Sequence, residues 1–315
     1  MKHLAVVALG GNALIREKQK GTIDEQEQNV YDTCEKLLDL IKLDYNLIIT
    51  HGNGPQVGNI LMRNEAGFQT YNIEKMPLDI CVADSQGGIG YMIERQLRNV
   101  LNVAGIEKNI ITVVTQVLVD KNDEAFQNPS KPIGPFYLKE EAEQLEKSNK
   151  WIFREDVRKR GWRKVVASPK PIDILNKQAI KAMADQGVIV IAVGGGGIPV
   201  YRHENNYLEA IEAVVDKDLA SALLAREVGA DEFYIITDVP GVYINFNTPG
   251  QEMLKEITIE EAENYFEQGQ FSSGSMGPKI KAAINFLNEG GRLTVITEAD
   301  EIEKPGCGTR IINKK

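Results

Sequence analysis

The sequence predicts an α/β fold built around a mostly parallel sheet. Short apolar runs rich in β-branched residues alternate with amphipathic segments along the 315 residues, a pattern typical of helices layered on strands that are buried on both faces. Three of these runs end in glycine-rich segments, as strands that lead into binding turns often do. The composition, 43% hydrophobic and 26% charged, is that of a globular chain with a sizeable core.

Six apolar runs are expected to form buried strands. They span residues 4–9, 47–50, 110–114, 188–193, 233–236 and 293–296. Amphipathic helices are expected between them: one over 24–43, one with an apolar stripe from Ile89 to Leu101, one beginning at Ile174 and one around Leu219. Each stripe is interpreted as core packing, with subunit contact as a minority alternative for the broad stripe at 89–101.

Residues 117–170 interrupt this alternation. They are rich in charge, proline and aromatic side chains, and we expect them to leave the sheet as a functional excursion, since loops of this length are usually functional. The run VGGGG at 193–197 marks a boundary further along. It divides an N-terminal lobe, residues 1–195, from a C-terminal lobe, residues 196–315.

Charge and cysteine content exclude several classes of protein. The formal net charge of −9 argues against a nucleic acid or an anionic membrane as partner. The three cysteines lie far apart and form no CxxC pair, so neither a disulfide framework nor a zinc site is expected. No stretch approaches the ~20 apolar residues that cross a bilayer. These observations predict a soluble protein of the cytoplasm.

Three predicted strands run directly into glycine-rich turns. A turn of this kind can direct consecutive backbone N–H groups at an anion. One such turn is weak support, but three at the carboxyl ends of strands favour a binding site. The turns contain Gly10, Gly11 and Asn12; Gly52, Asn53 and Gly54; and Gly194 to Gly197, including Gly195 and Gly196.

Familiar nucleotide and metal motifs do not account for these turns. None of them matches GxGxxG followed by a ribose-binding acid, and no GxxxxGK[ST] occurs. HRD and DFG runs of protein kinases are also missing from the sequence. His203-Glu204 lacks the spacing of HExxH, and His51 is interpreted as a residue that flanks its turn. A phosphate site at these turns would therefore follow none of these known motifs.

Two lysines stand at predicted helix starts. Lys217 lies between Asp216 and Asp218, and Lys279 follows a run of glycine, serine and proline. Phosphoryl transfer needs positive charge around the transferred oxygens, so both are candidates, although most lysines are solvated surface charges. Asp216 could orient Lys217 and its neighbours, or act only as a helix N-cap. Lys131, within the excursion, is a further candidate.

Eight segments together carry a resemblance to a known family. They read ALGGNAL at 8–14, THGNGPQVG at 50–58, DKNDEAFQNPSKPIGPFY at 120–137, RGWRKVVASP at 160–169, VGGGGIPV at 193–200, VVDKD at 214–218, TDVPGVY at 237–243 and GSMGPK at 274–279. The chain resembles the carbamate kinases along nearly its whole length. GGN, the DKD lysine and GSMGPK are shared with the wider amino-acid kinase superfamily, whereas NPSKPIGPFY and RGWRKVV resemble the protruding subdomain that distinguishes carbamate kinases.

The resemblance implies an architecture and a reaction. The expected fold is an open three-layer αβα sandwich with a small protruding subdomain at about 117–170. The N-terminal lobe would bind the phosphoryl acceptor and the C-terminal lobe would bind ATP with Mg²⁺. The expected reaction is ATP + carbamate ⇌ ADP + carbamoyl phosphate, catalysed by a homodimer. Carbamate is already a nucleophilic anion, so the reaction needs no general base, only positioning and charge neutralisation.

The resemblance also implies roles for individual residues. Lys217 and Lys279 would stabilise the transition state, Asp216 would orient them, and Lys131 would reach in from the protruding subdomain. The transferred phosphoryl group and the carbamate would meet the glycine turns, at Gly10, Gly11, Asn12, Gly52, Asn53, Gly54, Gly195 and Gly196. The nucleotide would be lined by Thr237, Asp238, Tyr243, Met276 and Lys279. No side chain is expected to ligate the metal, since Mg²⁺ would be held mainly by the ATP phosphates.

Two departures from the family and two rival functions remain. Ala167 stands where the family often has proline, and RHENNYLEAIE is a variable hairpin; neither touches an expected catalytic position. The nearest rival is a superfamily kinase for another acceptor, such as acetylglutamate or a nucleoside monophosphate. A rival of another class is a non-catalytic regulator that binds nucleotide, which would tolerate loss of the lysines.

Overall fold

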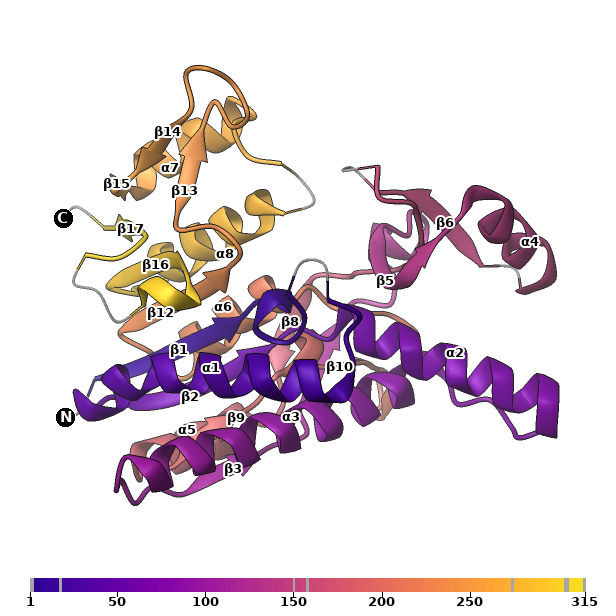
Figure 1. Ribbon diagram of the computed structural model, residues 1–315, viewed down its shortest axis with the longest axis horizontal. Helices are drawn as coiled ribbons and strands as arrows, with labels where there is room; N and C mark the ends of the chain where they lie inside the picture. The colour runs from indigo at the N-terminus through magenta and orange to yellow at the C-terminus, as the bar shows by residue number, and fades with distance from the viewer. Residues whose placement is uncertain are drawn as a thin grey trace.

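The fold is known from a computed structural model, which describes residues 3–16, 19–149, 151–156, 159–272, 275–302 and 306–313, apart from the side chain of Asn12. An eight-stranded sheet forms its centre (Figure 1). In spatial order its strands are β15 (Glu256–Thr258), β17 (Thr309–Ile312), β16 (Leu293–Glu298), β12 (Glu232–Thr237), β1 (Leu4–Leu9), β2 (Asn46–His51), β9 (Ile189–Ile191) and β3 (Ile110–Thr112).

Neighbouring strands of this sheet are parallel except for the pair β16 and β17. β1 lies in the middle, with β2 on one side and β12 on the other. The strand order therefore reverses next to β1, and the crevice outside such a reversal is where α/β proteins bind their ligands.

Helices cover both faces of the sheet (Figure 1). Alternate residues of β1 enter two separate cores: Leu4, Val6 and Ala8 lie in one, and Ala5, Val7 and Leu9 in the other. The second core is completed by α1 (Ile23–Lys42) and α3 (Leu78–Val103), and the first by α5 (Lys177–Asp185), α6 (Lys217–Glu227), α7 (Ile259–Glu267) and α8 (Met276–Asn288). Burial on both faces explains why β1 is apolar at every position.

All six predicted strands are present, with ends shifted by a few residues. The predicted first helix is α1, which begins after Thr22 because that side chain and Glu25 form a reciprocal capping box. The third predicted helix was placed wrongly at its start. Ile174 is the last residue of a strand, β8 (Pro171–Ile174), and helix α5 begins at Lys177.

Two smaller sheets flank the centre. One has the order β11 (Leu208–Ala210), β10 (Ile198–Arg202), β4 (Gln116–Val119) and β8. The other pairs β13 (Val242–Ile244) with β14 (Glu252–Leu254). Because β4 and β8 pair with each other at either end of the predicted excursion, residues near 117 and 170 belong to the body of the molecule.

The folded centre of the excursion projects from the body. It consists of an antiparallel sheet of β5 (Lys131–Tyr137), β7 (Trp162–Val166) and β6 (Ile152–Glu155), with α4 (Lys139–Asn149). Figure 1 shows these elements standing away from the central sheet, next to α2 (Gly54–Tyr71). No helix among the described residues is long and apolar enough to span a membrane.

Candidate active site

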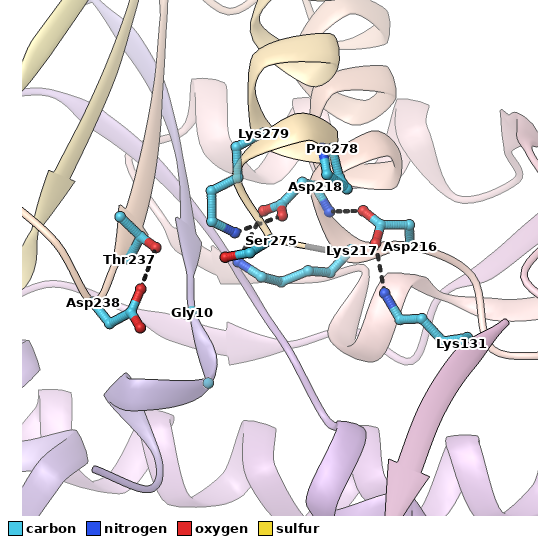
Figure 2. Close-up of a pocket in the computed structure, with 11 residues that line it drawn as sticks. Gly10, Lys131, Asp216, Lys217, Asp218, Thr237, Asp238, Ser275, Pro278 and Lys279 are labelled. Atoms are coloured by element: carbon cyan, nitrogen blue, oxygen red, sulfur yellow. Dashed lines mark hydrogen bonds and ion pairs between the residues drawn. The ribbon is translucent and has the colours of Figure 1, made fainter. Parts of the chain in front are cut away.

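A polar pocket of about 250 Å³ opens at the carboxyl ends of the central strands. Its wall is formed by residues from five segments of the chain (Figure 2). These residues are Gly10, Gly11, Lys131, Asp216, Lys217, Asp218, Thr237, Asp238, Ser275, Pro278 and Lys279. Parallel packing places the residues that follow β1 and β12 at one edge, and the first turns of α6 and α8 carry the lysines to it.

The first glycine turn fits closely against β12. A Cβ added at Gly10 would lie 2.5 Å from the carbonyl oxygen of Ile236, so the approach of the two backbones excludes a side chain there. A Cβ added at Gly11 would meet nothing within 4 Å. Gly10 is therefore needed for packing, whereas Gly11 presents open backbone to the pocket. Asn12 lies with Gly11 in a short 3-10 helix, η1 (Gly11–Ala13), but its side chain lies outside the described structure.

Asp218 joins the two candidate lysines. Its Oδ2 accepts a hydrogen bond from Lys279 Nζ at 2.8 Å, and its Oδ1 lies 3.0 Å from Lys217 Nζ (Figure 2). All three side chains are at least 88% buried. Burial opposes the charge of Asp218, but the two ammonium groups outweigh it and hold its pKa far below the usual range. One carboxylate thus holds two cations side by side.

The pKa values of Lys217 and Lys279 shift in opposite directions. Burial lowers the pKa of Lys217, and Asp218 offsets only part of that cost. Burial also opposes the charge of Lys279, but its ion pair with Asp218 raises the pKa above the usual value. The ammonium of Lys217 is buried and makes no hydrogen bond within the described part of the chain. A buried cation with unused donors in a pocket wall is suited to receive an anion.

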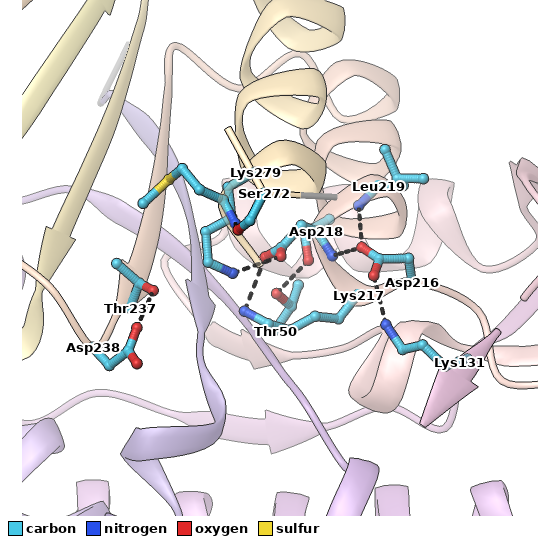
Figure 3. A network of polar contacts seen from close by, with 12 residues as sticks. Thr50, Lys131, Asp216, Lys217, Asp218, Leu219, Thr237, Asp238, Ser272 and Lys279 are labelled. Carbon is cyan, nitrogen blue, oxygen red and sulfur yellow. Dashed lines mark hydrogen bonds and ion pairs between the residues drawn. The ribbon is translucent and has the colours of Figure 1, made fainter. Parts of the chain in front are cut away.

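Asp216 has a different partner from the one expected. Its Oδ2 accepts a hydrogen bond from Lys131 Nζ at 2.5 Å, while its Oδ1 accepts from the backbone N–H groups of Asp218 and Leu219 (Figure 3). It is thus both the N-cap of α6 and the anchor of Lys131. Burial acts against its charge, but Lys131 holds the pKa of Asp216 below normal.

The orienting role expected of Asp216 stays a prediction, and it is not carried by direct contact with Lys217 or Lys279. In the structure, Asp218 makes the direct contacts with these two lysines. Asp218 was not among the expected site residues, although its place next to Lys217 in DKD was a usable signal. Ser275 and Pro278 also line the pocket without having been expected.

The second and third glycine turns lie behind the pocket wall. A Cβ at Gly52 would be 3.5 Å from Lys217 Cδ, and one at Gly54 would be 3.7 Å from the carbonyl oxygen of Pro132 in β5. Gly195 and Gly196 have positive φ and pack tightly, since a Cβ at Gly195 would collide with the amide of Asn53 at 2.1 Å. These turns therefore contact the lysine and each other, and they do not line the pocket.

Polar side chains from α3 fasten these two turns together. Gln86 Nε2 donates to the carbonyl oxygens of Gly194 at 2.9 Å and Thr115 at 3.2 Å, while Gln86 Oε1 accepts from Thr115 N at 2.8 Å. Asn53 Nδ2 donates to Ser85 Oγ at 2.8 Å. We call Ser85, Gln86 and Thr115 the polar clamp. It is buried, so it fixes the turns through directional bonds at little cost in unpaired groups.

His51 also belongs to this buried layer. It is 1% exposed, and burial lowers its pKa to about 4. The imidazole is therefore neutral near pH 7, and its Nδ1 donates to the carbonyl oxygen of Gly52 at 3.0 Å. A Cβ at Gly194 would lie 2.4 Å from His51 Nε2. His51 flanks its turn, as the sequence indicates, and it also fills the space between the two turns.

Apart from Lys279, the residues expected to line the nucleotide divide into two groups. Thr237 and Asp238 line the pocket at the end of β12, and Thr237 Oγ1 donates to Asp238 Oδ1 at 3.1 Å. Tyr243 lies on β13, and Met276 is the first residue of α8. Neither is part of the pocket wall.

Within the described residues, no cluster of three or more histidine, cysteine or acidic side chains could hold a metal ion.

Comparison with known proteins gives a consistent result. The model of the amino acid kinase family matches residues 3–298. The carbamate kinase of Pyrococcus furiosus is 48% identical over 315 residues, which cover 99% of this chain and 100% of that protein. The structures of the Giardia lamblia carbamate kinase bound to citric acid and to AMP-PNP are each 42% identical, cover 99% of both chains and superpose with TM-scores of 0.93 and 0.90.

Proposed function

The chain belongs to the amino acid kinase family and, within it, to the carbamate kinases, and on that premise we propose that it catalyses ATP + carbamate ⇌ ADP + carbamoyl phosphate. The observation that carries the proposal is the pair of buried ammonium groups joined by Asp218 in the wall of a polar pocket. Lys217 keeps unused donors there, as a site for transferred phosphoryl oxygens requires.

The chemical step is an in-line displacement. A carboxylate oxygen of carbamate attacks the γ-phosphorus of ATP, the bond from that phosphorus to the β–γ bridging oxygen breaks, and ADP leaves with the bonding electrons. No proton is transferred, so no general base is required. Lys217 and Lys279 neutralise the negative charge on the equatorial oxygens, and the backbone of Gly10 and Gly11 in the pocket wall supports the same group.

The two substrates would approach from opposite sides of the lysine pair. Lys131 reaches the pocket from β5 and would bind the carbamate or carbamoyl end. Thr237 and Asp238 would face the phosphates of the nucleotide, with Tyr243 and Met276 further out around its nucleoside. Gly52, Asn53, Gly54, Gly195 and Gly196 would shape the acceptor side indirectly, by holding Lys217 and the neighbouring turns in place.

Mg²⁺ is proposed to enter as part of the nucleotide substrate. The two carboxylates in the centre of the pocket, Asp216 and Asp218, are engaged by lysines, which leaves the phosphates of ATP as the main ligands of the ion. The bound metal would share in neutralising the phosphate charge. Lys217, Lys279 and Lys131 supply the remaining positive charge from the chain itself.

We also propose that the enzyme is a cytoplasmic homodimer. Cys34, Cys81 and Cys307 are free thiols, which suits a reducing compartment. Large apolar side chains are exposed around the turn between α2 and α3, at Phe68, Tyr71, Ile73, Met76 and Ile80. Several exposed large apolar side chains within one short stretch of the chain favour a subunit contact.

An acceptor panel tests the proposed reaction. ADP formation from MgATP would be followed with carbamate, supplied by ammonium and bicarbonate, and in parallel with N-acetylglutamate and with UMP. We expect turnover with carbamate alone. Turnover with one of the other acceptors, and none with carbamate, would assign the chain to a different activity of the family.

A further inference from the structure

We propose that Arg163, which lies outside the pocket wall, is a positioning residue that sets the reach of Lys131 into the active site. This inference rests on the proposed function, because it assigns Arg163 a part in binding the carbamoyl end of the substrate. Arg163 lies on β7 of the projecting sheet, and Lys131 is the first residue of the neighbouring β5.

The pairing of β5 with β7 is irregular at one place, and Arg163 lies at that place. Ile133 pairs with Lys164 and Tyr137 pairs with Trp162, so residues 134–136 of β5 stand opposite Arg163 alone. Such a bulge bends its strand and leaves backbone groups unpaired. Arg163 Nε and Nη2 both donate to the carbonyl oxygen of Gly134, at 3.1 and 2.8 Å. The guanidinium thus binds one backbone carbonyl of the bulge, that of Gly134.

The bulge is also the point where β5 crosses helix α2. Gly134 has a φ of +72°, and a Cβ added at Gly58 of α2 would lie 2.0 Å from Gly134 Cα. The two backbones are therefore in direct contact, with no side chain between them. Gly134 is therefore a fixed pivot of β5, held by two contacts. Its Cα packs against Gly58 of α2, and its carbonyl oxygen accepts two hydrogen bonds from Arg163.

Lys131 is three residues from this pivot along the same strand. Between them Ile133 is fully buried in a core shared with Val57 of α2 and Val214, close to the start of α6. Lys131 Nζ then reaches Asp216 at 2.5 Å. Because this stretch is short and packed, a shift of the Gly134 carbonyl moves Lys131 relative to the pocket, and small misplacements of a binding group reduce turnover strongly.

The chemistry of the site requires arginine. A guanidinium presents two N–H groups in a fixed fork, which one lysine ammonium reproduces poorly. Burial, together with the charge of Arg160, lowers the pKa of Arg163 to about 10, so the group is charged near pH 7. Both arginines contact the ring of Phe136, whose centroid lies 5.4 Å from Arg163 Cζ and 4.8 Å from Arg160 Cζ.

Arg160 provides a matched control on the same ring. Its Nε donates to Asp156 at 2.9 Å in an exposed hydrogen bond, whereas Arg163 bonds the Gly134 carbonyl at the bulge. The experiment compares wild type with Arg163→Ala, Arg163→Lys and Arg160→Ala. For each protein we would measure the thermal midpoint, kcat, and the separate KM values for carbamoyl phosphate and ADP.

We expect Arg163→Ala to raise KM for carbamoyl phosphate roughly 10- to 100-fold, with KM for ADP unchanged. Arg163→Lys should be intermediate, and Arg160→Ala should match wild type. Loss of fold alone would reduce the active fraction without changing one KM selectively. If Arg163→Ala does not fold, Arg163→Lys alone decides the question by the same KM comparison. Equal changes in both KM values, or a change in neither, would overturn the inference.

A double-mutant cycle tests the route through Lys131. The dissociation constant of carbamoyl phosphate, measured by calorimetry without ADP, would be compared in wild type, Lys131→Ala, Arg163→Ala and the double variant. We expect Arg163→Ala to have little further effect once Lys131 is absent. Full additivity would overturn the inference and leave the proposed function intact. A wild type that makes no ATP from ADP and carbamoyl phosphate would instead remove the proposed function, and the inference with it.

Discussion

Asp218 sets the charge balance of the site at the scale of single residues. Asp218→Asn keeps the shape of the side chain but removes the carboxylate that holds Lys217 and Lys279 together. Breaking a buried ion pair in this way costs about 3–5 kcal/mol of unfolding free energy, which denaturant titration would measure. A loss below about 1 kcal/mol, the range of a surface pair, would contradict the buried arrangement.

The same substitution predicts a change in pH dependence. Burial lowers the pKa of Lys217 and the carboxylate of Asp218 raises it. Activity should therefore fall as the pH rises through the pKa of Lys217, and Asp218→Asn should move this alkaline limb to lower pH, because the interaction that favours the charged form is gone. A profile of kcat/KM against pH checks this, and a limb that stays in place or moves upward would contradict it.

Gly10 and Gly11 are adjacent but should respond oppositely to alanine. Gly10→Ala forces a Cβ against the carbonyl oxygen of Ile236 and should lower the unfolding free energy by roughly 1–3 kcal/mol. Gly11→Ala meets open space and should leave stability unchanged or raise it by up to about 1 kcal/mol. Because Gly11 lines the pocket, we expect its replacement to lower kcat/KM. Thermal denaturation and steady-state kinetics on both variants separate the two effects, and the reverse pattern would refute the assignment.

The starts of α6 and α8 are encoded by nearby residues, whereas the contacts between these helices are not. The positions of Lys217 and Lys279 at the starts of helices could be predicted, because glycine, aspartate and proline mark helix starts locally. The exchange of Asp216 for Asp218 as the partner of these lysines could not. The two carboxylates are two positions apart in the sequence. Which of them meets Lys279 depends on how α6 packs against α8, because Asp218 and Lys279 are 61 residues apart in the chain.

At the scale of elements, α3 supports the active-site turns through the polar clamp. Gln86→Leu would leave the Gly194 carbonyl and the Thr115 N–H without the bonds they make to Gln86, and each buried unpaired group costs about 1–3 kcal/mol. We expect a lower thermal midpoint together with reduced kcat/KM. Gln69→Leu on α2 is the control, since that amide bonds Glu65 on an exposed surface. Equal behaviour of the two variants would remove the role given to the clamp.

The prediction of elements succeeded where the pattern was strong. The apolar runs at 4–9 and 293–296 are strands because both faces of the sheet are covered. Helix α2 was not predicted, since Gly58 and Gly67 interrupt its pattern and only Val57 and Gly58 are buried among its residues. Gly58 is a requirement of the crossing with β5, which local propensity does not reveal. Ile174 looked helical but ends a strand because β4 pairs with it.

At the scale of the whole molecule, the α2–α3 turn is expected to form the dimer contact. Ile80→Glu combined with Tyr71→Glu places two charges in the exposed apolar patch. We expect this double variant to sediment as a monomer in analytical ultracentrifugation, with wild type as a dimer. Leu43→Glu, at the exposed end of α1, is the control. A wild-type monomer, or a double variant that remains dimeric, would place the contact elsewhere or remove it.

One continuous sheet runs through the molecule, and the pocket lies where its two halves meet. β1 pairs with β12 along their lengths, and both strands end at the pocket, whose wall includes Gly10 directly after β1 and Thr237 as the last residue of β12. The division into lobes at 195/196 stays a prediction. Under the proposed function it would place the acceptor over β1 and β2 and the nucleotide over β12, on either side of Lys217 and Lys279.

The formation of ATP from ADP and carbamoyl phosphate tests the central claim most directly. A luciferase-coupled assay would compare wild type with Lys217→Ala, Lys279→Ala and Lys281→Ala, the last an exposed lysine on the same helix as Lys279. We predict ATP formation by wild type and Lys281→Ala, and kcat/KM lower by about 10²–10³ in each of the other two variants, with folding retained. No ATP from wild type, or near-normal turnover in both pocket variants, would contradict the account.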